Sequence, residues 1–303
     1  MRQSLHDFMR VGIVHFMAYP SAKDKDAYLE TIAEIAYDEF FGGIEITSAP
    51  DAETANDARN MLKSAGLAVG FGAQPILLGK KGNLNAFDVD ERTKAVELVK
   101  HAVDEAYSLG AQKLGLLSGP TVEASMQDKA ARLLIESLQE ICSYANTKGD
   151  LAVTLELFDQ ATDKRCLVGS TRLAVEVAQE VRKTDGKFGL MVDLSHLPMQ
   201  GESPAKALFT TRGYLTHAHM GNCVMRDVHD PLYGDTHPRF GYTGGEIDVP
   251  ELTEYLRALL DIGYLAEGGT EVLAFEIKPA PGESSKAIIA QAKRTLRQAW
   301  QRV

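Results

Sequence analysis

The sequence predicts a single (β/α)8 barrel that spans all 303 residues. Short apolar runs of strand length alternate with amphipathic stretches of helical length, and we count eight such pairs. Strands that alternate with helices form a parallel sheet, and eight of them can close into a barrel of about 250 residues. The alternative is an open doubly wound sheet. It is disfavoured because HFMAYPS, rather than a glycine-rich turn, follows the first strand.

The first half of the chain holds four of the expected pairs. Helical spacing is clearest in the first helix, where Leu29, Ile32 and Ile35 share one face. Gly66 and Gly110 directly follow two of the helices, where a left-handed C-cap favours glycine. The expected strands are 11–16, 43–47, 67–72 and 112–117, and the helices are 24–41, 51–65, 88–109 and 122–147.

The second half of the chain repeats the alternation without a linker or a shift in composition. The expected strands are 151–157, 188–193, 214–220 and 271–277, and the helices are 170–183, 203–212, 250–262 and 284–300. The connection before the seventh helix is too long and too polar to be a routine turn. We therefore expect residues 221–248 to form a lid or a substrate loop.

The composition points to a small-molecule partner. A formal net charge of -10 argues against a nucleic-acid surface, which needs a basic stripe. The N-terminal stretch lacks the apolar core of a signal peptide, and no later apolar run is long enough to cross a membrane. Three scattered cysteines make neither a disulfide framework nor a zinc site. The expectation is a cytoplasmic protein, with a homo-oligomer left open.

Four of the expected strands end in an acidic residue or an imidazole. Glu156, Asp193, His219 and Glu276 stand in the segments TLELFD, MVDLSH, THAHMGN and AFEIKP. In a (β/α)8 barrel the strand ends of one face meet and carry the active site. Buried carboxylates are costly unless they are paired or bind a metal. Two Glu, one Asp and one His therefore predict a site for one divalent ion.

The order Glu, Asp-x-x-His, His, Glu on successive strands resembles the xylose-isomerase-like superfamily. This superfamily includes sugar isomerases, ketose 3-epimerases typified by D-tagatose 3-epimerase, sugar dehydratases and, more distantly, endonuclease IV. The resemblance implies that all four residues are metal ligands, and that Glu156 and Glu276 are also the catalytic proton carriers. Its motifs are concentrated in residues 154–279.

The implied activity is isomerisation or epimerisation of a sugar, or of a sugar derivative, through a cis-enediolate. A divalent ion that bridges a carbonyl and the adjacent hydroxyl acidifies the C–H bond between them, and a carboxylate on each face can move the proton. Three carboxylates among the four ligands favour Mn²⁺ or Mg²⁺, ahead of Co²⁺ or Zn²⁺. Two alternatives stay open: a metal-dependent decarboxylase or dehydratase of a keto-sugar acid, and a non-catalytic sugar-binding barrel.

Further residues are expected to bind the substrate. The resemblance matches His196 with a substrate-binding histidine and Arg226, less closely, with a substrate arginine. His15 and Glu45 lie at or near the ends of the first two strands, where barrel enzymes often contact the far end of a substrate.

A second metal site is an open alternative for His196, Asp235 and His237. These three residues match ligands of an additional zinc in endonuclease IV. That enzyme also needs histidines after the third and fourth strands, where this chain has Gln74 and Ser118. A nuclease is therefore disfavoured. If no second ion binds, the three side chains are expected to bind the substrate or to brace the loop.

Strand alternation gives an expectation about substrate charge. Lys278 follows Glu276 by two residues, so both side chains should face the barrel mouth. Arg226 and Arg239 would add positive charge above the ion, and arginine suits forked recognition of carboxylate or phosphate. The pattern therefore predicts an anionic carbohydrate, such as a keto-sugar acid.

Overall fold

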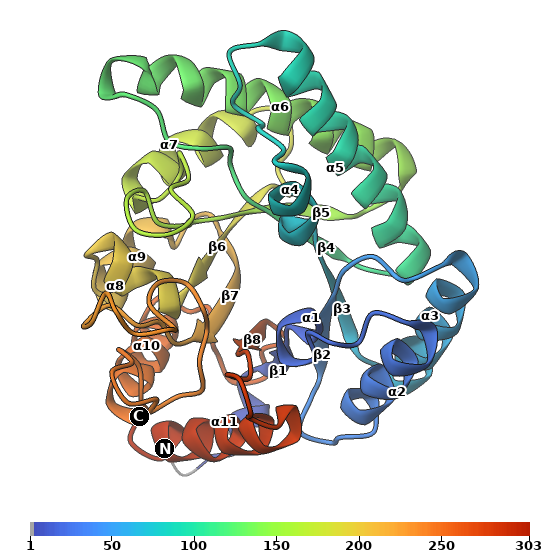
Figure 1. Ribbon diagram of the computed structural model, residues 1–303, viewed down its shortest axis with the longest axis vertical. Helices are drawn as coiled ribbons and strands as arrows, with labels where there is room; N and C mark the ends of the chain where they lie inside the picture. Colours follow the sequence, from blue (N-terminus) through green and yellow to red (C-terminus); the bar gives the residue numbers. More distant parts are fainter. Residues whose placement is uncertain (1–2) are drawn as a thin grey trace.

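The computed structural model describes residues 3–303 and has eight parallel strands in a nearly closed barrel with helices around it (Figure 1). Along the sheet the strands follow the order β1-β8-β7-β6-β5-β4-β3-β2. The predicted single (β/α)8 barrel is confirmed. The strands are β1 Arg10–Ile13, β2 Gly43–Ile46, β3 Ala68–Gly72, β4 Lys113–Leu116, β5 Ala152–Glu156, β6 Gly189–Asp193, β7 Leu215–Gly221 and β8 Val272–Glu276.

The barrel is closed by contacts between its first two strands. β1 pairs with β8 along its whole length, whereas β1 and β2 meet through an isolated parallel bridge between Val14 and Glu45. The backbone N–H of Gly42 also donates to the carbonyl of Val11, at 2.9 Å. The start and the end of the described chain lie close together, because the indole N–H of Trp300, the last residue of α11 (Ser285–Trp300; Figure 1), donates to the carbonyl of Gln3 at 2.9 Å.

Eight helices follow the strands in the predicted order. Two of the predicted C-caps are confirmed, because Gly66 and Gly110 have φ values of 71° and 77°. At the other end of α3, the Asp51 carboxylate accepts from the N–H of Thr54. These helices are α2 Lys25–Ala36, α3 Ala52–Ala65, α5 Val89–Leu109, α6 Gln127–Lys148, α7 Thr171–Val181, α9 Pro204–Thr211, α10 Val249–Asp261 and α11 Ser285–Trp300. Their apolar faces pack on the outside of the sheet and form the core.

Short helices at the C-terminal ends of the strands were not predicted. The first strand was expected to reach Phe16, but it ends at Ile13 and a one-turn helix follows. After β6, the Asp193 carboxylate accepts from the N–H of Ser195 and starts a 3-10 turn. The short elements that follow strands are α1 His15–Ala18, α4 Gln74–Lys80, η3 Leu194–His196 and α8 Leu197–Gln200. Two further turns are η1 Leu5–Asp7, before β1, and η2 Ala124–Met126, before α6.

Among the described residues, the connection between β7 and α10 contains no helix and no strand of the barrel sheet. Backbone bridges join Val224 to Gly234 and to Gly245. The Asn222 amide donates to the carbonyl of Arg239 at 3.0 Å and accepts from the N–H of Ile247 at 2.8 Å. These contacts hold the middle of the connection at the mouth of the barrel. No helix in the range 3–303 has the length and apolar character needed to cross a membrane.

Candidate metal centre and substrate cavity

The four predicted metal ligands come together at the ends of β5 to β8. One ligand atom each from Glu156, Asp193, His219 and Glu276 lies within 4.8 Å of the others. His219 Nδ1 is central: it lies 2.7 Å from Glu276 Oε2, 3.8 Å from Glu156 Oε1 and 3.9 Å from Asp193 Oδ2. The predicted convergence of the strand ends is therefore present.

The donor set fits a divalent ion. Glu156 Oε1 and Asp193 Oδ2 are buried and have no hydrogen-bond partner among the described residues, although a buried polar atom normally has one. Three carboxylates and one imidazole are ligands that suit Mn²⁺, Mg²⁺ or Zn²⁺. The outer oxygens are held by the protein, because Gln74 Nε2 donates to Glu156 Oε2 and Ser195 N donates to Asp193 Oδ1, both at 2.7 Å.

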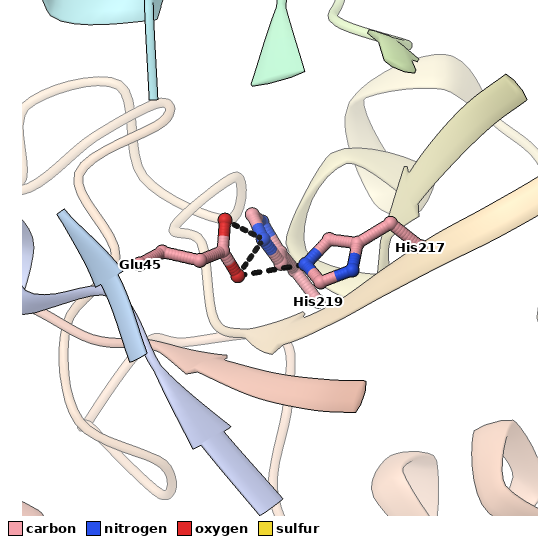
Figure 2. A group of neighbouring side chains, drawn as sticks. All are labelled: Glu45, His217 and His219. Atoms are coloured by element: carbon pink, nitrogen blue, oxygen red, sulfur yellow. Dashed lines mark hydrogen bonds and ion pairs between the residues drawn. The ribbon is translucent and has the colours of Figure 1, made fainter. Parts of the chain in front are cut away.

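Glu45 lies behind His219 on the other side of the imidazole. The Nε2 atom of His219 is 2.9 Å from Glu45 Oε1 and 3.1 Å from Oε2, and His217 Nε2 is 2.7 Å from the same Oε1 (Figure 2). All three side chains are buried. The predicted substrate contact Glu45 therefore makes its hydrogen bonds to two histidines of β7.

A second buried group surrounds Asp235, in the connection between β7 and α10. Asp235 Oδ1 lies 3.1 Å from His196 Nε2 and 2.8 Å from His237 Nε2, and Lys164 Nζ lies 3.2 Å from Oδ2. The Nδ1–H of His196 donates a hydrogen bond to the carbonyl of Leu157 at 2.7 Å. The three residues of the alternative second site are thus together. The donor atoms within 4.8 Å of one another are, however, those of Asp193, His196 and His237.

The two predicted proton carriers have pKa values displaced in opposite directions. Burial raises the pKa of Glu156 to about 8, and the negative charge of Glu276 adds to the rise. Burial acts against ionisation of Glu276 as well, but His237 and His219 outweigh it and lower the pKa of Glu276 to about 2. In the metal-free protein these opposite shifts favour the protonated form of Glu156 and the ionised form of Glu276 at neutral pH.

Two histidines of the site, His196 and His237, have raised pKa values. Burial opposes their protonation, but Asp235 raises the pKa of His196 well above its usual range, and Glu276 and Asp235 raise the pKa of His237 to about 9. In return, His196 and His237 outweigh the effect of burial and lower the pKa of Asp235 well below its usual value. Asp235 is therefore an anion between two cationic rings.

The site opens into a cavity of about 510 Å³. Its apolar wall comes from the β1–β3 side of the barrel and includes Phe16, Tyr19 and Leu78, with Phe158 contributed from the β5 side. Three lysines also line it. Lys164 is paired with Asp235, whereas Lys23 and Lys278 are exposed and make no ion pair with any described residue. Lys278 lies on the cavity side, as strand alternation predicted.

The remaining predicted substrate residues differ in position. His15 lines the cavity, and its Nε2 lies 2.8 Å from Thr31 Oγ1. Burial lowers the pKa of His15 to about 4, so the ring is neutral. The structure does not bring Arg226 and Arg239 to the cavity wall. Each instead pairs with a local carboxylate, Arg226 with Glu246 at 3.4 Å and Arg239 with Glu283 at 2.9 Å.

Sequence reasoning missed three side chains that complete the site. His217 precedes His219 by two residues, so strand alternation would have placed both on one face. Gln74 was noted only because it stands where endonuclease IV has a histidine. It is the first residue of α4, and its side-chain amide donates a hydrogen bond to Glu156. Lys164 lies in the irregular segment after β5, and no local pattern marks it.

The chain is similar to one known family and to several solved structures. The profile of the xylose isomerase-like TIM barrel family matches residues 29–299. The zinc-bound IolI protein superposes with a TM-score of 0.75 at 15% identity, covering 97% of this chain and 99% of that one. A D-tagatose 3-epimerase-like protein gives 0.73 at 17% identity, with coverages of 97% and 99%. D-Psicose 3-epimerase from Clostridium cellulolyticum H10, solved with D-tagatose, gives 0.65 at 20% identity, with 97% of both chains covered. No curated protein gives a significant sequence match.

Proposed function

Because the chain belongs to the xylose isomerase-like TIM barrel family, we propose that it is a metal-dependent isomerase or epimerase of a small sugar or sugar derivative. The observation that carries this proposal is the pair Glu156 and Glu276. Both contribute ligand atoms to the group of four that could hold a divalent ion, and the buried atom Glu156 Oε1 has no hydrogen-bond partner among the described residues. The structural neighbours named for ketose epimerisation support the same reaction class.

In this proposal Glu156, Asp193, His219 and Glu276 hold one divalent ion, with Mn²⁺ or Mg²⁺ expected. A bound ion would supply positive charge for the oxygens of a cis-enediolate and lower the barrier to its formation. The unpartnered atoms Glu156 Oε1 and Asp193 Oδ2 support this ligand set.

The two glutamates would move the proton. Ionised Glu276 takes a proton from the carbon next to the substrate carbonyl, and the electron pair left behind forms the enediolate. A proton carried by Glu156 would then be donated to the other face of that carbon in an epimerase. In an isomerase it would go to the neighbouring carbon, and the hydroxyl proton of the enediolate would move to the other oxygen. In the reverse reaction the two residues exchange roles. Gln74 would keep Glu156 oriented through its 2.7 Å hydrogen bond.

The second buried group would bind substrate oxygens. His196 and His237 are held by Asp235 and border the proposed ion, so their polarised rings suit hydroxyl groups of the substrate. A second cation at Asp193, His196 and His237 is the alternative. Metal analysis distinguishes the two, because one ion per chain fits hydroxyl binding and two ions per chain fit the second site.

A metal-dependent lyase acting on a keto-sugar acid is the second candidate. It is favoured by the unpaired lysines Lys23 and Lys278 at the cavity, which suit a carboxylate or phosphate group. Both lyase reactions pass through an enolate. A dehydratase would form it by removing a proton and then expel water from the next carbon, whereas a decarboxylase would form it by losing carbon dioxide and then protonate it. If the substrate is anionic, Lys278→Met should raise KM at least tenfold. An unchanged KM for the best substrate would remove this argument.

The experiment that tests the proposed function is a product analysis. The chelated protein is supplied with Mn²⁺, Mg²⁺, Co²⁺ or Zn²⁺ and incubated with neutral ketoses and with keto-sugar acids. We expect epimerised or isomerised sugar only when an ion is present, and release of water or carbon dioxide would identify a lyase instead. Glu156→Gln and Glu276→Gln should each lower turnover by about two to four orders of magnitude. Equal turnover after complete chelation would contradict the proposal.

A further inference from the structure

Three buried residues lie directly behind the proposed metal centre. Glu45 comes from β2, and His217 and His219 come from β7 (Figure 2). These strands are not neighbours in the sheet, so the Glu45 side chain crosses the barrel interior to reach the two rings. His217 and His219 stand two residues apart and face the same side of their strand. The three side chains are at most 6% exposed.

The contacts within this group have the lengths of hydrogen bonds. Glu45 Oε1 lies 2.7 Å from His217 Nε2 and 2.9 Å from His219 Nε2. A carboxylate can only accept, so each ring donates an N–H to it. His219 presents its other nitrogen, Nδ1, to Glu276 at 2.7 Å and to the remaining proposed ligands.

The tautomer of His219 decides whether a metal can bind. A neutral imidazole carries one N–H and one lone pair, and only the nitrogen with the lone pair can bind an ion. In the metal-free structure Nδ1 also lies 2.7 Å from Glu276 Oε2 and donates to it, so both ring nitrogens carry a proton. When an ion displaces the Nδ1 proton, the Nε2–H bond to Glu45 leaves the lone pair on Nδ1, which faces the ligand cluster. Carboxylates that accept the second N–H of a ligating histidine fix its tautomer and ring orientation in this way.

Gly70 makes room for Glu45. A Cβ atom at position 70 would lie 2.8 Å from Glu45 Cγ, which is closer than such atoms approach one another. Gly70 is on β3, the neighbour of β2, and stands opposite Glu45 in the strand register. The bare backbone at this position therefore permits the side-chain path that brings Glu45 to β7.

We propose that Glu45 is a positioning residue for His219. Together with His217, it keeps the Nε2–H of His219 pointed toward Glu45. The other ring nitrogen, Nδ1, then faces the remaining proposed ligands, which are Glu156, Asp193 and Glu276. The inference rests on the proposed metal site and adds the hydrogen bond that orients one of its ligands, His219. Ligand atoms of Glu45, His217 and His219 also lie within 4.8 Å of one another. An ion bound there would instead require the lone pair on Nε2 of His219.

Glu45→Gln is the most informative variant. It keeps the size of the side chain and its polarity but removes the charge. The carbonyl oxygen of Gln can still accept from a ring, but without the negative charge it holds the Nε2–H of His219 less strongly. The tautomer with its lone pair on Nδ1, the proposed ligand atom, is then less favoured, and we expect about 10- to 100-fold weaker metal binding.

Gly70→Ala tests the same idea without changing a polar group. The added methyl group should displace Glu45 and weaken metal binding at least threefold. Gly82→Ala is the matched control, because its Cβ would meet the flexible side chain of Leu77 at 2.6 Å, and its other nearest atoms belong to Leu98 and Ala95 of α5. We expect the control to bind metal as wild type does, whatever its effect on stability.

The experiment measures Mn²⁺ affinity by calorimetry for the chelated wild type and the three variants, with circular dichroism as the test of folding. In parallel, ¹⁵N NMR of histidine-labelled, Zn²⁺-loaded wild type should show a His219 ring coordinated through Nδ1 and protonated at Nε2. Wild-type affinity in folded Glu45→Gln and Gly70→Ala, or coordination through Nε2, would overturn this inference alone. If the wild type binds no divalent ion, the proposed metal site fails and this inference fails with it. Should Glu45→Gln not fold, Gly70→Ala and the NMR measurement decide.

Discussion

Replacing Glu156 by Gln should stabilise the metal-free protein at neutral pH while removing its activity. Burial and the charge of Glu276 raise the pKa of Glu156 from 4.5 to about 8. Between these two pH values the folded chain holds a proton that the unfolded chain releases, so stability falls as the pH rises. At pH 7, about 2.5 pH units above the ordinary pKa, this costs about 3 kcal/mol.

Glutamine at this position is neutral at every pH and can still accept from Gln74 Nε2, which bonds the outer oxygen of Glu156 at 2.7 Å. We therefore expect Glu156→Gln to exceed the wild type in free energy of unfolding by about 3 kcal/mol at pH 7, and by less than about 1 kcal/mol at pH 5. The assay is urea unfolding in the presence of a chelator at both pH values. A variant that is less stable than the wild type by the same amount at both pH values would refute the reasoning.

Three other predictions concern stability and the cavity. A divalent ion at 100 times its dissociation constant should stabilise the wild type by about 2.7 kcal/mol and raise its Tm by several degrees in a thermal scan. The Tm of Asp193→Asn should rise far less at the same ion concentration. An equal rise in both proteins would place the ion elsewhere. Burial lowers the pKa of His15 to about 4, so only the unfolded chain takes up a proton there as the pH falls from 7 to 5, and the contribution of His15 to stability falls by about 2 kcal/mol. In urea unfolding, His15→Gln should therefore gain about 2 kcal/mol relative to the wild type between pH 7 and pH 5, and a difference between the two proteins that does not change with pH would contradict this. Lys23→Met should raise KM for an anionic substrate but not for a neutral ketose, and steady-state kinetics with equal effects on both would exclude recognition of charge.

The fold was predictable because it depends on local periodicity. Apolar runs such as 151–157 and the helical spacing of Leu29, Ile32 and Ile35 are repeated along the chain, and glycines at helix ends add independent signals. The short helices α1 and α4 were missed because they depend on packing at the end of the barrel. Pro75, in the first turn of α4, is as typical of a loop as of a helix start.

The metal centre was predictable because it lies on strands. Glu156, Asp193 and Glu276 end their strands and His219 lies two residues before the end of β7, so the topology brings them together. The grouping of His196, Asp235 and His237 came instead from the family resemblance. Side chains on connections follow paths that the sequence does not encode locally. Lys164 enters the cavity from such a segment. By contrast, Arg226 and Arg239 were expected above the ion and instead pair with Glu246 and Glu283.

The measurement that tests the central claim most directly is deuterium incorporation from heavy water. The metal-loaded wild type is incubated in D₂O with the best substrate from the product analysis, and the carbon next to the carbonyl is followed by NMR. Proton transfer by Glu276 and Glu156 predicts that the product carries deuterium at that carbon. Incorporation should fall by at least two orders of magnitude in Glu276→Gln. Product formed without solvent deuterium, or exchange by Glu276→Gln at the wild-type rate, would contradict the account.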